Sequence, residues 1–487
     1  MSWLLAIAGI LLVMLLGFLL WEIATARKPD FWESLAYAFP VGSGVTVIVM
    51  LLLAHFGQPL SRNRIMGSIL FLIAAAILVL RGLRRPLSSA TYHGKGNHAK
   101  GKGILWWCLL GVLAFQIVLV ALPIIQERAL GDWDAWAIWG LKAKAFYVDK
   151  GVSGYLGNAQ AYAFSWPSRP CLSSLVEAFV YSSMGGVHES AARGVHVFWF
   201  VSLLWIFYIA TRRVMSRTSA LFWTLVLSAI PNLAFQSNLG LSNMVLGSYL
   251  FAAIAALDRW RRHRDIRVLA AAAVLLGIAA LCRDEGVPLA IILTAAVVLT
   301  AESLRRSGLR TIALQTTVLV LGTIVIKSIW TLIVQRYSLA NLMDEWLSFR
   351  IFGRAAAHFH DLPSVLRMAL QELAIPEFQS RSLHFEKIIG VALFWPAFAL
   401  AALRLFLGKS SNRLALACTL AAFTGMAMYT AGYWLFPYQN LADLRDNWLF
   451  VMDRQMLCLV PLAAYVIAWS VSGNPSDQAS SELEQPQ

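Results

Sequence analysis

Charged residues are scarce in this sequence: they account for 14% of its 487 residues, whereas 59% are hydrophobic. A soluble protein covers its surface with charged side chains, because Lys, Glu, Arg and Asp almost never lie fully buried unless they are paired. The composition therefore excludes an ordinary soluble fold. It indicates a chain that crosses a membrane many times, since each crossing needs about 20 consecutive apolar residues.

Cofactor and metal motifs are also missing. The five cysteines are scattered singly, with neither a disulfide framework nor metal-ligand spacing. The glycine patterns of phosphate-binding and dinucleotide-binding loops are absent, and the nine histidines form no HExxH set. We therefore expect no cofactor, and dependence on a divalent metal is disfavoured but left open. Residues 1–21 are apolar but lack a basic n-region and a cleavage site, which predicts a membrane anchor rather than a cleaved signal peptide.

Apolar runs long enough to span a bilayer recur along the chain. We predict about thirteen transmembrane helices, each near the length that a crossing requires. They cover residues 3–21, 36–56, 64–82, 104–126, 194–211, 219–236, 241–257, 268–282, 286–301, 311–335, 388–407, 414–434 and 449–470. The predicted fold class is all-α: a polytopic membrane protein with short amphipathic helices in its outward-facing loops.

The net charge of +14 reflects this topology rather than an affinity for nucleic acid. Basic residues gather in short loops between the apolar runs, at 83–103, 212–217, 258–267, 302–310 and 408–413. With an odd number of crossings distributed as above, these loops all fall on one side, which the positive-inside rule identifies as the cytoplasm. The N-terminus then lies outside.

Two long segments, 127–193 and 336–387, are predicted to face outward with the N-terminus. Both are rich in Trp, Phe, Tyr and Leu. That composition argues against disorder and favours short amphipathic helices at the membrane interface.

The first of these segments contains Gly131-Asp-Trp-Asp-Ala-Trp-Ala-Ile-Trp-Gly-Leu-Lys-Ala-Lys-Ala-Phe-Tyr147, which places two carboxylates and two ammonium groups among three tryptophans. A carboxylate in a partly desolvated aromatic pocket can act as a general base, because burial raises its pKa toward the working pH. Asp134 and Asp132 are the candidates for this role. The structural alternative is that these aspartates cap the short helix that follows.

The lysines and tryptophans of the same stretch are candidate binding residues. Lys142 and Lys144 can hold a phosphate leaving group, although snorkelling to lipid headgroups explains a lysine at this depth equally well. Trp136 and Trp139 share one helical stripe with Phe146. Interfacial anchoring is one role for these rings, and stacking against a sugar is the other.

Two further charged clusters are predicted on the outer side. Arg283-Asp-Glu-Gly286 lies between two adjacent spans, where Gly286 permits a bend and Arg283 pairs with Asp284 or Glu285. A purely structural turn is the alternative. Arg454 follows an aspartate just inside the last span, and a buried arginine is costly unless that aspartate or a ligand phosphate satisfies it.

Three of these motifs together resemble a known superfamily. Trp133-Asp-Ala-Trp-Ala-Ile-Trp-Gly-Leu-Lys-Ala-Lys144 is similar to the first outer-loop motif of GT-C integral membrane glycosyltransferases, the group that includes bacterial protein O-mannosyltransferases and lipid A aminoarabinose transferases. Arg283-Asp-Glu-Gly286 resembles their Arg-x-Glu-Gly turn. Leu441-Ala-Asp-Leu-Arg-Asp-Asn-Trp-Leu-Phe-Val-Met-Asp-Arg454 resembles a late motif that ends in Asp-Arg before the last span.

The resemblance implies an inverting glycosyltransferase that takes a sugar from a polyprenyl-phosphate donor. The acceptor would be a lipid, glycan or protein at the outer face of the bacterial inner membrane, so that the active site faces the periplasm. Carried over by motif, the catalytic aspartate is Asp134, with Asp132 as the second candidate. Arg454 and Lys142 or Lys144 would stabilise the departing lipid phosphate, and Arg283 and Glu285 would line the substrate site.

The resemblance also implies a division of the chain. Residues 1–103 would form an N-terminal three-helix membrane addition with a basic cytoplasmic loop, 104–470 the transmembrane catalytic module, and 471–487 a polar cytoplasmic tail.

Two departures from the superfamily pattern keep other functions open. Gly240-Leu-Ser-Asn243 stands where relatives often carry an acid, and Ser165-Trp-Pro-Ser-Arg-Pro170 stands where they carry a His-Pro pair. A non-catalytic partner in glycan assembly is therefore one alternative. A transporter or lipid flippase is another, although transporters tend to carry paired repeats and mid-membrane charges, and no repeat is apparent here.

Overall fold

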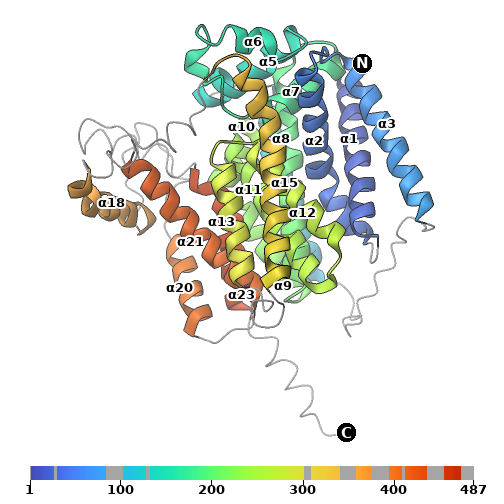
Figure 1. Cartoon of the computed structure of the whole chain (residues 1–487). Coiled ribbons are helices and arrows are strands. Elements are labelled where there is room, and N and C mark those ends of the chain that lie inside the picture. Colours follow the sequence, from blue (N-terminus) through green and yellow to red (C-terminus); the bar gives the residue numbers. More distant parts are fainter. Residues whose placement is uncertain are drawn as a thin grey trace.

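The computed structural model describes residues 2–26, 30–83, 103–127, 132–300, 309–339, 358–374, 394–407, 412–435 and 455–472. Every regular element within these ranges is helical. The long helices run side by side in one bundle (Figure 1). The all-α prediction is therefore confirmed.

Seven helices are long and apolar enough to cross a membrane. They are α1 (Ser2–Ala24), α2 (Phe31–His55), α3 (Arg62–Gly82), α4 (Ile104–Ile125), α8 (Glu189–Arg212), α15 (Leu309–Gln335) and α21 (Arg413–Trp434). An eighth span results if α9 (Arg217–Ser228) and α10 (Pro231–Leu239), which meet at a 64° bend before Pro231, count as one. The chain is a polytopic membrane protein, but the predicted number of thirteen spans is not confirmed.

The difference in number comes mainly from short helices. Four apolar helices are shorter than a typical span: α12 (Ile266–Ala280), α13 (Gly286–Leu299), α20 (Phe394–Leu407) and the final helical stretch ending in α23 (Val460–Val471). Because each residue adds about 1.5 Å, α12 and α13 reach only about 20 Å. The turn between α12 and α13 is covered by other helices, since Leu281, Cys282 and Arg283 are buried.

The two ends of the bundle differ in composition. The short helices α5 (Leu141–Val148) and α6 (Ser153–Gly157) cover the end at which α1 begins, which we call the outer end (Figure 1). At the opposite, basic end, α3, α8 and α11 (Ser242–His263) carry basic residues in their last turns. This arrangement agrees with the predicted separation of the 127–193 segment from the basic loops. Which side of a membrane each end faces stays a prediction.

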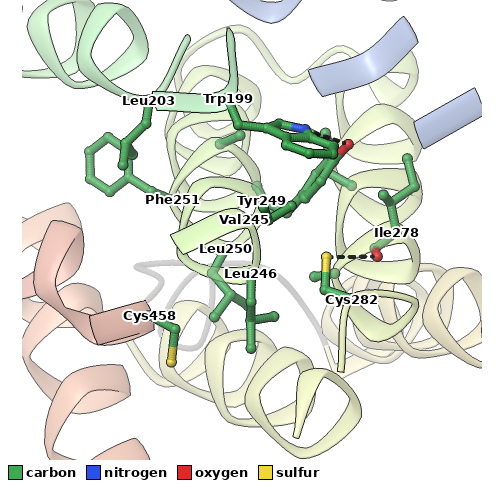
Figure 2. Packing of buried hydrophobic residues seen from close by; sticks show 14 of the residues in the cluster. Trp199, Leu203, Val245, Leu246, Tyr249, Leu250, Phe251, Ile278, Cys282 and Cys458 are labelled. Carbon is green, nitrogen blue, oxygen red and sulfur yellow. Dashed lines mark hydrogen bonds between the residues drawn. The ribbon is translucent and has the colours of Figure 1, made fainter. Parts of the chain in front are cut away.

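Helix α11 forms the centre of the bundle. Its residues from Ser242 to Trp260 are all buried, as expected for a helix that is surrounded by others. Side chains of α8 and α11 pack there against Ile278 of α12 and Cys282, which follows α12 (Figure 2). Trp199 lies above Tyr249 in this view. Gly247 allows the chain near Cys458 to approach closely, because an added Cβ would lie 2.9 Å from the Cα of Cys458.

The first two helices pack at backbone contact. A Cβ on Gly17 would lie 1.9 Å from the carbonyl oxygen of Ala38, and one on Gly42 would lie 1.9 Å from that of Val13. Small residues at such crossings let membrane helices approach closely. Both helices belong to the same hydrophobic core as α8 and α11. The proposed boundary at residue 103 stays a prediction.

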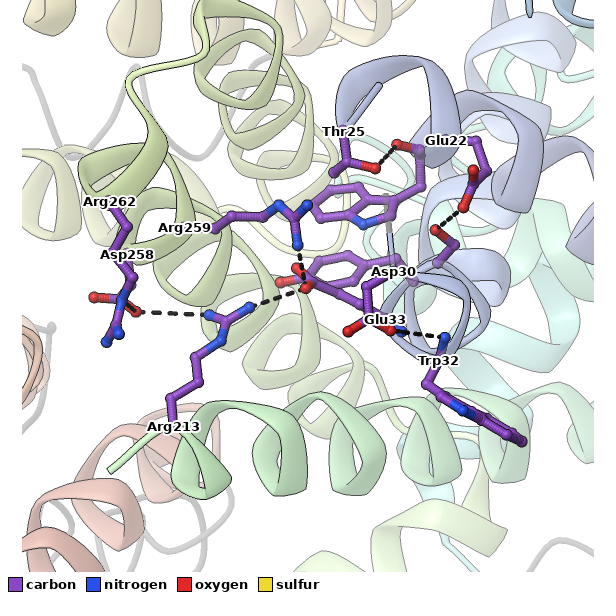
Figure 3. A network of polar contacts seen from close by, with 12 residues as sticks. Glu22, Thr25, Asp30, Trp32, Glu33, Arg213, Asp258, Arg259 and Arg262 are labelled. Carbon is purple, nitrogen blue, oxygen red and sulfur yellow. Dashed lines mark hydrogen bonds and ion pairs between the residues drawn. The ribbon is translucent and has the colours of Figure 1, made fainter. Parts of the chain in front are cut away.

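A network of ion pairs joins three helices at the basic end. Glu33 of α2 accepts from Arg213, which follows α8, at 3.0 Å, and also from Arg259 of α11. Asp258 pairs with Arg213 at 3.6 Å and with Arg262 at 2.9 Å (Figure 3). Glu33 is almost fully buried, so two arginines are needed to compensate the loss of its hydration.

The outer segment is built differently from the prediction of interfacial helices. It contains η1 (Asp134–Gly140), α5, α6, η2 (Ala163–Ser165) and α7 (Leu172–Met184). Every residue of α7 is buried, and this helix packs against α5, α8 and α1. It is therefore part of the bundle core. Of the second predicted outer segment, the structure describes a short turn, η3 (Phe359–Asp361), and α18 (Leu362–Ala374).

Candidate active site

The motif with the two aspartates begins with a helix cap. A side-chain oxygen of Asp132 accepts from the backbone N–H of Asp134 at 2.9 Å and of Ala135 at 3.4 Å. These contacts match those of an N-cap residue, the structural alternative for Asp132, whereas its catalytic role stays a prediction. The helix that follows, η1, has π-helical hydrogen bonding, a feature that often accompanies functional sites.

The tryptophans of the motif divide between the core and the surface. Trp139 is 2% exposed and packs with Leu239 and Leu241. Trp136 is 44% exposed and meets the ring of Trp133 at a centroid distance of 4.6 Å. Trp136 alone of the two predicted aromatic binding residues is accessible to a ligand.

Lys142 is completely buried, and its ammonium group is engaged by protein. Its Nζ donates to the carbonyl oxygens of Trp166 at 2.8 Å and Arg169 at 3.3 Å. Burial lowers the pKa of Lys142 to about 7. This geometry indicates that Lys142 holds the 166–169 loop in place rather than contacting a phosphate directly. Lys144 forms an ion pair with Glu189 at the surface.

The loop held by Lys142 presents an arginine. Trp330 of α15 donates a hydrogen bond from its Nε1 to the carbonyl oxygen of Ser168 at 2.9 Å, which also fixes the loop to α15. The guanidinium of Arg169 stacks on Trp166, 4.3 Å from the ring centroid. It donates no hydrogen bond to any residue in the described part of the chain. Burial, and then the positive charge of Arg283, lower the pKa of Arg169.

The turn between α12 and α13 carries a second arginine, and its ion pair matches one of the two predicted partners. Arg283 donates from Nε and Nη2 to the two oxygens of Glu285, both at 3.1 Å, and its Nη1 lies 3.4 Å from Ser242. A bidentate pair of this kind fixes both side chains. Gly286 fits the tight bend, because a Cβ there would lie 2.3 Å from the carbonyl oxygen of Ala279.

Asp284, the other acid of the turn, faces a lysine inside a membrane-spanning helix. Its carboxylate lies 3.6 Å from the Nζ of Lys327 in α15. Lys327 is eight residues before the end of α15, about 12 Å below the outer end of that helix. A charge at that depth needs a partner, and Asp284 supplies it.

These residues form one charged group, which we call the outer charge cluster: Asp134, Arg169, Arg283, Asp284, Glu285 and Lys327. Arg169 interacts electrostatically with Arg283, both acids of the turn and Asp134. Asp134 also acts on Arg283. Segments 150 residues apart in sequence are therefore brought together at the outer end.

The predicted site residues fall into four groups. Asp134, Arg283 and Glu285 belong to the outer charge cluster, and Asp132, Lys142, Lys144 and Trp139 make contacts within the protein. Trp136 is exposed. Arg454 lies outside the described residues. The prediction missed Arg169 and Lys327. A lysine within an otherwise apolar run was a signal for Lys327, and an arginine between two prolines, Pro167 and Pro170, was a weaker one for Arg169.

Fold and site thus define a polytopic all-α membrane protein with a charged cluster sunk into one end. No protein-family model matches the chain, and no curated protein matches it. Two solved structures of an oligosaccharyltransferase from Archaeoglobus fulgidus show a distant likeness. One is the archaeal oligosaccharyltransferase AglB with an inhibitory peptide and a dolichol-phosphate, at 12% identity and a TM-score of 0.42, covering 78% of this chain and 52% of that one.

The other is the apo form, at 12% identity and a TM-score of 0.37, covering 79% of this chain and 59% of that one. The chain thus spans little more than half the length of either structure. Likeness at this level carries no argument about activity.

Proposed function

We propose that the chain is a glycosyltransferase that moves a sugar from a polyprenyl-phosphate donor to a lipid, glycan or protein acceptor at the outer face of the bacterial inner membrane. The observation that carries this proposal is Arg169. Its guanidinium is half-buried, stacked on a tryptophan and unpaired among the described residues, in a cluster whose other two cations already have acidic partners. Such a guanidinium is suited to a phosphate, which it can bind with two hydrogen bonds.

The reaction needs a base and an anion site near each other. The acceptor oxygen attacks the anomeric carbon, the bond from that carbon to the phosphate oxygen breaks, and the acceptor's proton passes to Asp134. The polyprenyl phosphate leaves with the bonding electrons, and Arg169 stabilises its negative charge. Asp134 and Arg169 are close enough to interact electrostatically, which supports this division of roles.

The depth of the cluster suits a lipid-borne substrate. Arg283 in the α12–α13 turn is buried, and Lys327, the partner of Asp284, lies about 12 Å below the end of α15. A phosphate attached to a polyprenyl chain stays near the membrane surface, so its sugar can reach a recessed site without leaving the bilayer. Lys142 and Trp330 would keep Arg169 in place while the phosphate is exchanged.

Replacing Arg169 tests this proposal. With purified protein in liposomes and a polyprenyl-phosphate sugar donor, Arg169→Gln should lower the rate of transfer about a hundredfold or more, the effect of losing one donor to a developing charge. Arg169→Lys should restore part of it, because the charge remains. Arg81→Gln, at an exposed position in the last turn of α3, is the matched control. Transfer by Arg169→Gln at the rate of this control would reject the proposal.

A second candidate function is transport of a charged lipid. The ion pair between Lys327 and Asp284 inside the bundle, together with the bent pair α9 and α10, favours it. Buried charge and broken helices are features of transport pathways. Movement of a labelled polyprenyl phosphate between leaflets without sugar transfer would support this candidate, and transfer without such movement would exclude it.

A further inference from the structure

An open groove lies between α2 and α3 at the outer end, away from the outer charge cluster. Its volume is about 520 Å³, within the range of pockets that hold small molecules. It exists because α3 packs mainly against α1 and leaves the last turns of α2 uncovered. Gly67 leaves its wall open, since no atom lies within 4 Å of the position a Cβ would occupy.

The walls of this groove change from polar to apolar along their length. Gln58, Asn63 and Arg64 line it at the loop that joins the two helices, and Phe71 and Val49 line its far end. Each wall covers about eight residues, or roughly 12 Å of helix. Both helices are candidate membrane spans. This gradient matches an amphiphile that has its headgroup at the loop and its hydrocarbon chain between the helices.

The polar end of the groove is basic. The Nη1 of Arg64 donates to Gln58 at 2.6 Å, which leaves its other donors available. Among the described residues no carboxylate pairs with Arg64 or with Arg62, and the first turn of α3 contains no acid. The side chain of Ser61 does not cap the helix, so the first backbone N–H groups of α3 add positive potential at the same point.

We propose that this groove binds an anionic phospholipid of the surrounding membrane, with the phosphate at Arg64 and one acyl chain over Gly67. Phe56 and Phe71, which are 71% and 72% exposed, would then lie against hydrocarbon. The apolar wall argues for an acyl chain, and Arg64, which has no carboxylate partner among the described residues, argues for a negative headgroup. This proposal does not depend on the proposed enzymatic activity.

A lipid in this position would support the outer segment. The loop between the two helices is tied to it, because the N–H of Leu60 donates to the carbonyl of Lys150 at 2.7 Å. Arg336, at the end of α15, donates to the carbonyl of His55 at the end of α2. Bound lipid should therefore raise thermal stability through α2, α3 and the segment that covers the outer end.

The experiment uses the full chain, stripped of lipid in detergent and titrated with phosphatidylglycerol or phosphatidylcholine. Thermal midpoints and retained lipid in native mass spectrometry are the two readouts. Phosphatidylglycerol should raise the midpoint and be retained, and phosphatidylcholine should do so much less. Arg64→Gln should weaken retention about tenfold or more, the factor expected from one charge-assisted hydrogen bond. Gly67→Trp should abolish it by filling the groove.

Matched controls lie on the same helix outside the groove. Arg81→Gln and Leu78→Trp should bind phosphatidylglycerol as the unaltered chain does. Equal binding of both lipids, or undiminished binding by Gly67→Trp, would overturn the proposal. So would competition by polyprenyl phosphate at equal concentration, which would assign the groove to the donor, or a change of oligomeric state in Arg64→Gln, which would assign it to a second copy.

Discussion

The burial of Lys142 predicts an unusual dependence of stability on pH. Burial lowers its pKa from 10.5 to about 7, and in the unfolded chain the lysine keeps its ordinary value. Between these two values the unfolded chain binds the additional proton, so the free energy of unfolding rises as the pH rises through this window. The full difference corresponds to roughly 5 kcal/mol, as an order of magnitude.

Lys142→Met removes this titration and leaves the side-chain volume nearly unchanged. The carbonyls of Trp166 and Arg169 then lose a donor, and each buried unsatisfied group costs roughly 1–3 kcal/mol. The variant should be less stable than the unaltered chain at high pH, where the neutral amine still donates. The difference should shrink as the pH falls from 10.5 to about 7 and stay constant below that.

Thermal unfolding in detergent, measured at pH values from about 6 to about 10, tests this reasoning. The midpoint of the unaltered chain should rise over this interval relative to that of Lys142→Met. Lys144→Met is the control, because Lys144 lies two residues away in a half-exposed ion pair. Parallel pH profiles for all three proteins would refute the assignment of this titration to Lys142.

Two further predictions concern packing. Glu33→Gln removes the buried carboxylate that pairs with Arg213 and Arg259. This change should lower the free energy of unfolding by roughly 3–5 kcal/mol. An unchanged thermal midpoint would contradict the stabilising role of this ion-pair network. In Gly17→Leu, the added Cβ would lie 1.9 Å from the carbonyl oxygen of Ala38, so the two helices could not keep their packing. The variant should therefore no longer elute as a single monodisperse species in size-exclusion chromatography. An unaltered elution profile would show that α1 and α2 are not packed at backbone contact.

Local sequence patterns predicted the helices and the separation of charge between the two ends. Apolar runs predict helices because the length and composition of each run can be read from the local sequence alone. The Arg283 turn was predictable for the same reason, since its ion pair and its glycine lie within four residues. The number of spans was not, because an apolar run of 14 or 15 residues, as in α12 and α13, does not reveal whether it crosses or ends inside the bundle.

Contacts between segments that are distant in the chain could not be predicted from the sequence. Lys142 and Lys144 occupy similar positions in the motif, yet one is buried under the 166–169 loop and the other is at the surface. Nothing in the motif separates them, because the difference depends on a loop more than twenty residues away. Arg169 was missed for the same reason: it becomes a candidate only when Lys142, Trp330 and the α12–α13 turn surround it.

In the proposed reaction, the outer charge cluster transfers sugar from a lipid phosphate and Asp134 is the base. The most direct measurement is sugar transfer from a polyprenyl-phosphate donor in liposomes that contain either the unaltered chain or Asp134→Asn. Asn keeps the size of the side chain and removes the proton acceptor, so transfer should be lost while expression and the thermal midpoint stay unchanged. Transfer by Asp134→Asn at the rate of the unaltered chain would contradict the account.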